Sequence, residues 1–300
     1  ELARLMLDDS FGLMERGAKH TTAPLLFDEV DIGRAFELWK GIEYHETVRV
    51  GDLNIQLLDA GHVLGSAMIR IESGGLARSA TAKGEVLLVT GDLGNPPTPL
   101  LRPTEQVSDA NYLVIESTYG DRIHEDRENR RLRIERVVED TIRRGGTLMV
   151  PVFSLERTQE FLYEVERLIE EGRIPAIPVF LDSPLAIRAT EVYRKYSNYF
   201  NPEARSTLKD TDIFQFAQLH LTPDTEDSKA INTVPSPKIV IAGSGMSTGG
   251  RILNHEQRYL PDANSTLLLI GYQSAGTRGR RLQDGAKEVE IFGEKIPVRA

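Results

Sequence analysis

The stretch Leu53-Asn-Ile-Gln-Leu-Leu-Asp-Ala-Gly-His-Val-Leu-Gly-Ser66 contains the pattern on which the interpretation of the whole chain depends. Asn54 to Leu58 is typical of a short buried strand, and the pair Ala60-Gly61 ends it. His62 therefore stands where a strand passes into a loop. A side chain at such a position is held firmly and still reaches solvent.

Two further strand-like runs end in the same way. The run Val86–Thr90 is followed by Gly91 and Asp92, and the run Tyr112–Glu116, which we expect to be a fully buried strand, ends in a carboxylate. Three successive strands thus end in a residue that can bind a metal or handle a proton. His62, Asp92 and Glu116 are the candidate site.

Each of these residues also has a purely structural interpretation. His62 could be a hydrogen-bonded structural histidine, Asp92 a turn former or helix cap, and Glu116 a cap for the turn that follows it. A divalent metal takes imidazole nitrogens and carboxylate oxygens from several strand ends, which favours a joint role for His62 and Asp92. A catalytic zinc needs at least three protein ligands, so these two residues alone are not enough.

Composition limits the class of protein. The 300 residues exceed the ~150 that serve as a prior for one domain. The net charge of −9 argues against a generally polyanion-binding exterior and still allows a local basic groove. The chain has no cysteine, which excludes disulfides and thiolate metal sites and favours a reducing cytoplasm. The chain starts at Glu1 and stops in the strand-like run Ile296–Ala300, so we expect a piece of a longer protein.

The order of apolar runs predicts an α/β fold with two domains. Up to residue 120 the chain is rich in short strands of the meander type. From residue 121 strands alternate with helices, which indicates a mostly parallel sheet with flanking helices. The strands expected there are Thr147–Val152, Pro178–Leu181, Lys238–Ala242 and Thr266–Ile270, and the helices are Glu156–Glu171, Pro184–Tyr196 and Ile252–Tyr259. The predicted domains are residues 1–120 and 121–300.

Two glycine-rich loops in the second domain follow strands. The loops are Gly243–Gly250 and Gly271–Arg281. Backbone amides at such loops receive anions, but the first loop fits neither a P-loop nor a dinucleotide fingerprint, and both loops could be tight connections with surface arginines. The candidate phosphate-binding residues are Ser154, Arg157, Gly243, Ser244, Gly245, Arg251, Gly276, Thr277 and Arg278. The remaining histidines, to which we assign no role, are His20, His45, His124, His220 and His255.

Six motifs in order resemble the metallo-β-lactamase-fold ribonucleases that carry an inserted β-CASP domain. They are Asp-Ala-Gly-His-Val-Leu-Gly-Ser, Thr-Gly-Asp, Glu-Ser-Thr-Tyr-Gly, Pro-Val-Phe-Ser-Leu-Glu-Arg-Thr-Gln-Glu, Gly-Ser-Gly-Met-Ser-Thr-Gly-Gly-Arg and Gly-Tyr-Gln-Ser-Ala-Gly-Thr. This group includes the endonuclease that processes pre-mRNA 3′ ends and its bacterial and archaeal relatives. The resemblance implies a partial αββα sandwich over residues 1–120 and a β-CASP domain over residues 121–300, with RNA held between them.

The resemblance also implies roles for the candidate residues. His62 would ligate zinc, Asp92 would bridge two Zn²⁺ ions and act in catalysis, and Glu116 would be the signature carboxylate that supports a catalytic histidine. The His-x-His-x-Asp-His motif of the family and its later histidine motifs do not occur in these 300 residues. We therefore expect a truncated chain that is inactive in isolation.

The function implied by the resemblance is zinc-dependent hydrolysis of RNA. A metal-activated water would cut the phosphodiester bond and leave a 5′ phosphate and a 3′ hydroxyl. We expect single-stranded RNA as the partner, no membrane association and a cytoplasmic location. Two alternatives stay open, a non-catalytic RNA-binding or scaffold subunit of the same fold and a small-molecule metallo-hydrolase. The oligomeric state is open too, a homodimer included.

Overall fold

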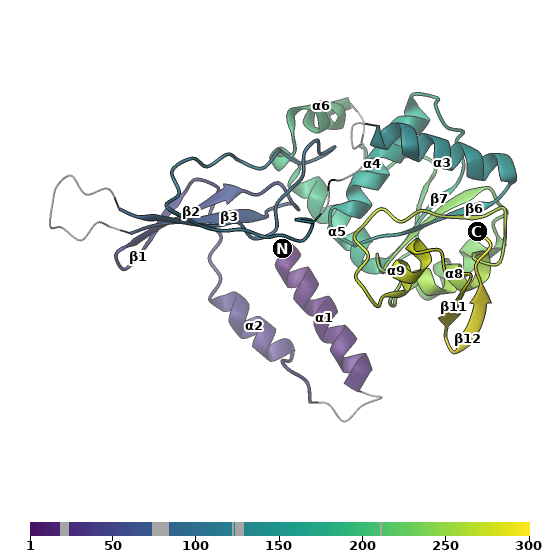
Figure 1. Ribbon diagram of the computed structural model, residues 1–300, viewed down its shortest axis with the longest axis horizontal. Coiled ribbons are helices and arrows are strands. Elements are labelled where there is room, and N and C mark those ends of the chain that lie inside the picture. Colours follow the sequence, from purple (N-terminus) through teal and green to yellow (C-terminus); the bar gives the residue numbers. More distant parts are fainter. Residues whose placement is uncertain (19–23, 74–83, 122, 124–128, 211) are drawn as a thin grey trace. The chain divides into compact units, whose positions relative to one another are not determined.

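The chain forms two compact units (Figure 1). The computed structural model describes residues 1–18, 24–73, 84–121, 123, 129–210 and 212–300. Unit 1 comprises Glu1–Leu5, Glu128–Tyr196 and Ser206–Ala300, and unit 2 comprises Met6–Arg127 and Ser197–Arg205. Within the described ranges, no helix has both the length and the apolar character needed to cross a membrane.

Unit 2 is built on a five-stranded sheet with the order β1-β2-β3-β4-β5. Strands β1 (Thr47–Val50), β2 (Leu53–Asp59), β3 (Ala67–Ser73) and β4 (Val86–Val89) are successive antiparallel neighbours, as the meander prediction required. Strand β5 (Tyr112–Val114) is parallel to β4. A small core of Leu58, Ala60, Met68 and Leu88 lies under the ends of β2, β3 and β4.

The prediction that the Tyr112–Glu116 run is fully buried is wrong. Tyr112, Leu113 and Val114 are 55–56% exposed. The strand is the last in the sheet order, and its one strand neighbour in the sheet is β4. Its apolar composition fits a buried strand, whereas its burial depends on neighbours that local sequence does not specify.

Two helices precede the sheet. They are α1 (Leu2–Ala18) and α2 (Glu29–Glu37). Helix α2 begins with a capping box, in which Asp31 N–H donates to Asp28 Oδ1 at 2.9 Å and Asp28 N–H donates to Asp31 Oδ2 at 3.2 Å.

Unit 1 contains a five-stranded parallel sheet with the order β10-β6-β9-β7-β8. The bounds are β6 (Thr147–Pro151), β7 (Val179–Asp182), β8 (Leu219–Leu221), β9 (Lys238–Ala242) and β10 (Thr266–Leu267). Every residue of the central strands β6, β9 and β7 is buried, which explains why these strands are continuous apolar runs rather than alternating ones. The predicted α/β class and parallel sheet are confirmed.

The connections that leave two neighbouring strands of this sheet, β6 and β9, run toward opposite edges of the sheet. From β6 the chain passes through α4 (Arg157–Glu170) to β7, and from the adjacent β9 it passes through α8 (Ile252–Tyr259) to β10. Because parallel crossovers are right-handed, α4 and α8 lie on opposite faces of the sheet. Figure 1 shows α3 (Arg130–Arg144) and α4 on one side of the strands and α8 on the other. A crevice at the carboxyl ends of β6 and β9 is the place where such sheets bind ligands.

Several short elements of the described chain had no sequence prediction. They are the 3₁₀ turns Ser197–Tyr199 and Ile231–Thr233, α6 (Pro202–Asp210), β8, α7 (Thr225–Ala230), α9 (Arg278–Gln283) and β11 (Glu288–Ile291). Strand β12 (Glu294–Pro297) overlaps the predicted strand-like run Ile296–Ala300 only at its last two residues. Helix α5 itself, Pro184–Lys195, was predicted one residue longer, and Ser183 caps it by accepting from Ala186 N–H. Strands β11 and β12 form an antiparallel hairpin.

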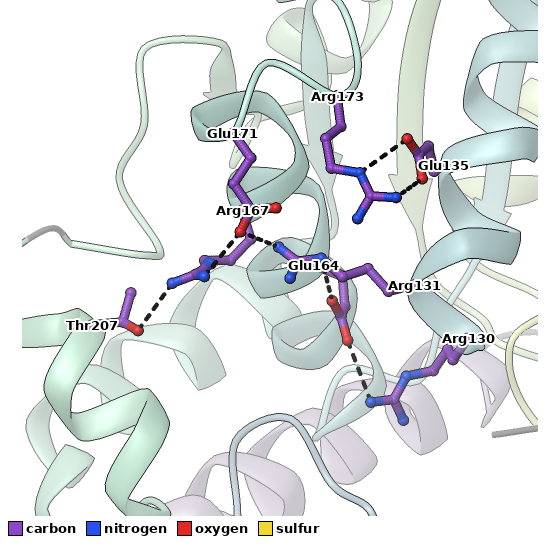
Figure 2. A network of polar contacts seen from close by, with 8 residues as sticks. All are labelled: Arg130, Arg131, Glu135, Glu164, Arg167, Glu171, Arg173 and Thr207. Atoms are coloured by element: carbon purple, nitrogen blue, oxygen red, sulfur yellow. Dashed lines mark hydrogen bonds and ion pairs between the residues drawn. The ribbon is translucent and has the colours of Figure 1, made fainter. Parts of the chain in front are cut away.

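Helix α4 is buried on almost every side, although it carries several glutamates. Arginines of α3 neutralise one of them, since Arg130 and Arg131 approach the Glu164 carboxylate at 3.3 and 3.6 Å (Figure 2). Glu171 accepts from Arg131 and Arg167, and Arg173 binds Glu135 through two nitrogens. These contacts satisfy charges that would otherwise be costly to bury between α3 and α4.

Candidate metal and nucleic-acid sites

The loop after β2 holds His62 in one orientation. Gly61 adopts a φ of 62°, and a Cβ at this position would lie 2.6 Å from the Arg102 carbonyl oxygen, so a glycine is needed there. The Ser66 hydroxyl accepts from the His62 and Val63 amides at 3.0 and 3.2 Å. These contacts fix the backbone from which the imidazole projects.

His62, Asp92 and Glu116 lie together at the ends of β2, β4 and β5. His62 Nε2 and Asp92 Oδ2 are 3.9 Å apart, and the Asp92 side chain is 73% exposed. Glu116 reaches the same place through the peptide of Leu93, whose N–H donates to Glu116 Oε1 at 2.8 Å. The carbonyl of that residue lies 3.2 Å from His62 Nδ1.

The Leu93 carbonyl determines which imidazole nitrogen is free to bind a metal. A carbonyl oxygen only accepts, so the Nδ1 atom of a neutral His62 carries the proton and donates to it. Nε2 is then unprotonated and faces Asp92. This arrangement, in which one ring nitrogen is held by a backbone carbonyl, is typical of histidines that ligate metals through the other.

Glu116 is ionised in this setting. Burial alone would raise its pKa, but hydrogen bonds from the Leu93 and Thr118 amides, together with the nearby His62, lower the pKa below its usual value. The carboxylate thus holds Leu93 and Thr118, and through Leu93 it orients His62. Among the described residues, its side-chain hydrogen bonds are to the Leu93 and Thr118 amides and not to the imidazole or to Asp92.

The three loops that carry the predicted phosphate-binding residues meet at one edge of unit 1. A Cβ on Gly245 or on Gly271 would lie 2.8 or 2.7 Å from the Phe153 ring, so both backbones pack directly on that ring. Gln273 Nε2 donates to the carbonyls of Gly245 and Gly271 at 2.8 and 3.0 Å. The loops after β6, β9 and β10 are therefore one assembly, at the ends of the strands between which the crevice is expected.

The loop from Gly243 to Gly250 closes on itself around Ser244. The Ser244 hydroxyl accepts from the amides of Thr248 and Gly249 at 3.0 and 3.2 Å. Gly250 has a φ of 75°, and a Cβ there would lie 2.3 Å from the Gly243 carbonyl oxygen. In the loop after β10, Gly276 has a φ of 84° and the Thr277 side chain caps α9.

The predicted arginines all have partners within unit 1. Arg278 donates to the carbonyls of Ser247 and Glu290, and Arg251 donates to Asp182 and to the carbonyls of Thr222 and Pro223. Arg157 pairs with Glu160. These contacts hold the loops in place, and phosphate binding by the same side chains stays a prediction.

The sequence pattern gave no role to His255 or to Asp182, yet the two residues form a buried cluster at the sheet edge. Asp182 ends β7 and is fully buried, and it accepts from His255 Nε2, Ser228 Oγ, Arg251 Nη1 and Thr222 Oγ1 at 2.7–2.9 Å. Burial would raise the pKa of Asp182, but the donors led by His255 lower it. An aspartate directly after a predicted strand was the signal available. His20 and His124 lie outside the described residues.

Comparison with protein-family models matches the Beta-Casp domain to residues 158–282, which contain all of α4 but its first residue, the strands β7 to β10 and both glycine-rich loops. Residues 158–282 are a β-CASP domain. A ribonuclease of Thermus thermophilus is 35% identical over 302 residues, which are 100% of this chain and 65% of the relative. An RNase J-like protein of Methanocaldococcus jannaschii is 32% identical over 299 residues, with 93% and 66% of the two chains covered.

A third relative is the endoribonuclease ysh1 of Schizosaccharomyces pombe, 30% identical over 277 residues that cover 91% of this chain and 35% of the relative. This chain therefore spans about two thirds of the length of the first two relatives and about a third of the third. The β-CASP match includes the three predicted loops in part, and His62, Asp92 and Glu116 lie before it.

Proposed function

We propose that this protein is a zinc-dependent ribonuclease that hydrolyses RNA phosphodiester bonds. The observation that carries the proposal is the approach of His62 Nε2 to Asp92 Oδ2 at 3.9 Å, with His62 Nδ1 held by the Leu93 carbonyl. The β-CASP domain and the names of the ribonuclease relatives support RNA as the substrate.

The residues present are of the types that bind zinc, but they are too few to hold an ion. An imidazole nitrogen and an exposed carboxylate are ligands that zinc takes in catalytic sites. Among the described residues, however, no group of three or more His, Cys, Asp and Glu side chains is close enough to hold an ion. The proposal therefore requires at least one further ligand from outside the described residues.

The chain's own residues have distinct tasks in this proposal. His62 and Asp92 would hold the metal, and Glu116 would keep the Leu93 peptide in the position that fixes the His62 tautomer. When bound, zinc would supply an activated water and stabilise the charge that develops on the phosphate. Cleavage in this way leaves a 5′ phosphate and a 3′ hydroxyl.

The assembly of three loops in unit 1 is the proposed RNA-binding edge. The Gly243–Gly250 loop, the loop after β10 and the residues Ser154 and Arg157 lie at the carboxyl edge of a parallel sheet, where anions bind. A negative overall charge of −9 is compatible with a local site of this kind, and we propose single-stranded RNA as its ligand.

A non-catalytic RNA-binding subunit is the second candidate. The observation that favours it is that the described residues bring together two metal-type ligands and a supporting carboxylate rather than a complete ligand set. The two functions differ in whether RNA is cut.

Cleavage of an end-labelled single-stranded RNA by the protein expressed from its complete gene tests the choice. The ribonuclease proposal predicts products with 5′ phosphates and loss of cleavage in the presence of a zinc chelator. Binding of the RNA without cleavage, in the presence of added zinc, would establish the binding subunit instead.

A further inference from the structure

Glu156 occupies a strained position between β6 and α4. Its φ and ψ are 60° and −59°, and the Arg157 amide donates to the Leu155 carbonyl across it at 2.8 Å. These values define a γ-turn with positive φ, a conformation that is rare for residues other than glycine. Such strain persists where the surroundings impose it, and it concentrates at functional sites.

Contacts from α5 and α4 hold the turn. Tyr193 of α5 is fully buried, and its hydroxyl donates to Glu156 Oε2 at 2.7 Å. The Glu156 carbonyl accepts from the Glu160 amide at 2.8 Å, which joins the turn to the first turn of α4. The neighbouring carbonyls are bound too, because Thr158 donates to Phe153 and Gln159 to Ser154.

The Glu156 carboxyl carries its proton at neutral pH. The residue is 2% exposed, and its Oε1 atom has no hydrogen-bond partner. Burial, with the Glu160 charge beside it, raises the pKa of Glu156 to about 8, although Tyr193 and Arg157 oppose the rise. The groups that act on this carboxyl thus come from both elements packed against it, Tyr193 from α5 and Glu160 and Arg157 from α4.

The γ-turn sets the position of the Arg157 backbone, from which the side chain projects. This arginine is the residue after the γ-turn, its side chain is 31% exposed, and it pairs with Glu160. When Glu156 is neutral, the charges of Arg157 and Glu160 neutralise each other at the RNA-binding edge. Removal of the proton would bury an unpaired charge, which is costly, and would add a negative charge beside a site for phosphates.

We propose that Glu156 is a positioning residue of the RNA-binding edge: protonated and bonded to Tyr193, it holds the γ-turn that presents Arg157, and loss of the proton weakens RNA binding. This inference rests on the proposed function for its ligand. It assigns to the edge a pH dependence that the phosphates and arginines of the complex do not have, because neither titrates between pH 7 and 9.

Binding of a labelled single-stranded RNA by the protein, measured from pH 7 to pH 9, tests the proposal. We expect the affinity of the unmodified protein to fall about three- to tenfold across pH 8, which is the scale of one poorly screened charge. Glu156→Gln keeps the shape and the acceptor for Tyr193 without an ionisable group, so its affinity should not change with pH. Glu170→Gln, at an exposed position at the other end of α4, is the matched control and should keep the pH dependence.

Two variants with smaller side chains distinguish the effect of the γ-turn on RNA binding from the effect of the carboxyl proton. Glu156→Ala keeps the strain and loses the bond to Tyr193, so its RNA affinity should be lower at every pH. Glu156→Gly adopts the positive φ without strain and should restore the affinity, again without pH dependence. A pH profile of Glu156→Gln equal to that of the unmodified protein, or equal affinities of the alanine and glycine variants, would overturn the proposal.

The unfolding midpoint in urea distinguishes failure of this inference from failure of the proposed function. If the unmodified protein binds no RNA at any pH, the RNA-binding edge is wrong. A midpoint that falls between pH 7 and pH 9 in the unmodified protein and is constant in Glu156→Gln still assigns the buried proton to Glu156. A midpoint that falls equally in both proteins removes that assignment.

Discussion

His62 Nε2 and Asp92 Oδ2 lie 3.9 Å apart, at the ends of two strands of the same sheet. No hydrogen bond joins the two atoms at this separation, and each is available to a shared ligand. Glu116 acts on this pair from the next strand through the Leu93 peptide. Because His62, Asp92 and Glu116 have different contacts, the proposed metal-binding role of each side chain can be tested separately.

Glu116→Gln should weaken zinc binding about 10- to 100-fold, the usual effect of removing a residue that orients a metal ligand. The carboxamide accepts from one backbone amide and presents N–H groups to the other, so the Leu93 peptide and the His62 tautomer are no longer fixed. Competition with a chromogenic chelator measures the affinity in the full-length gene product. Glu37→Gln, exposed at the end of α2, is the control, and equal losses in both variants would contradict the orienting role.

The buried acid Glu256 should make stability fall as the pH rises. Burial raises its pKa to about 7, although Ser247 and Arg278 oppose the rise. Because the folded pKa lies above the unfolded value, this contribution is fully present below about pH 4.5 and is lost as the pH rises to about 7. Urea unfolding at pH 5 and pH 8 should show a smaller difference for Glu256→Gln than for the unmodified protein. Equal differences would contradict the assignment.

Gly245→Ala should destabilise the protein by about 1–3 kcal/mol, the usual cost of overpacking. The added Cβ would lie 2.8 Å from the Phe153 ring, whereas a Cβ on Gly249 of the same loop meets nothing within 4 Å. Gly249→Ala is therefore the matched control. In a double-mutant cycle, Phe153→Leu should relieve much of the cost of Gly245→Ala. Additive effects would mean that the ring and the loop are not in contact.

Asp182→Ala should cost about 3–5 kcal/mol, because it leaves the Arg251 charge and three other donors without their acceptor in a buried setting. Asp284→Ala removes an exposed partner of Arg280 and should cost at most about 1 kcal/mol. Chemical denaturation of the two variants measures the difference. A cost for Asp182→Ala no larger than that of Asp284→Ala would show that the cluster around Asp182 does not stabilise the sheet edge.

The sequence predicts those elements that local pattern determines. The runs at β6 and β9 are continuous and apolar because both faces of the sheet are covered, and their bounds agree with the prediction to within one residue. Strand β11 and its pairing with β12 were missed although Val289, Ile291 and Ile296 alternate with charged residues, and only the run from Ile296 was predicted to be strand-like. Its turn uses Phe292 at a φ of 51°, and a phenylalanine is not a residue that predicts a tight turn.

The parts of the sites that the sequence does not predict depend on long-range packing. That His62 and Asp92 follow strands is visible in the sequence, whereas their 3.9 Å approach depends on the pairing of β3 with β2 and β4. Arg278 has the sequence context of an anion ligand, yet it binds the Ser247 carbonyl because two loops 31 residues apart lie in contact. The burial of Glu156 depends in the same way on Tyr193, which lies 37 residues further on.

Zinc content by elemental analysis, measured together with cleavage of single-stranded RNA, tests the central claim most directly. The protein from the complete gene is compared with its Asp92→Asn variant, and equal unfolding midpoints of the two proteins establish that the variant is folded. The account predicts about two zinc ions and cleavage for the unmodified protein, as in two-metal hydrolases, and loss of zinc and of cleavage in the variant. Cleavage by Asp92→Asn within a few-fold of the unmodified protein, or cleavage without zinc, would contradict it.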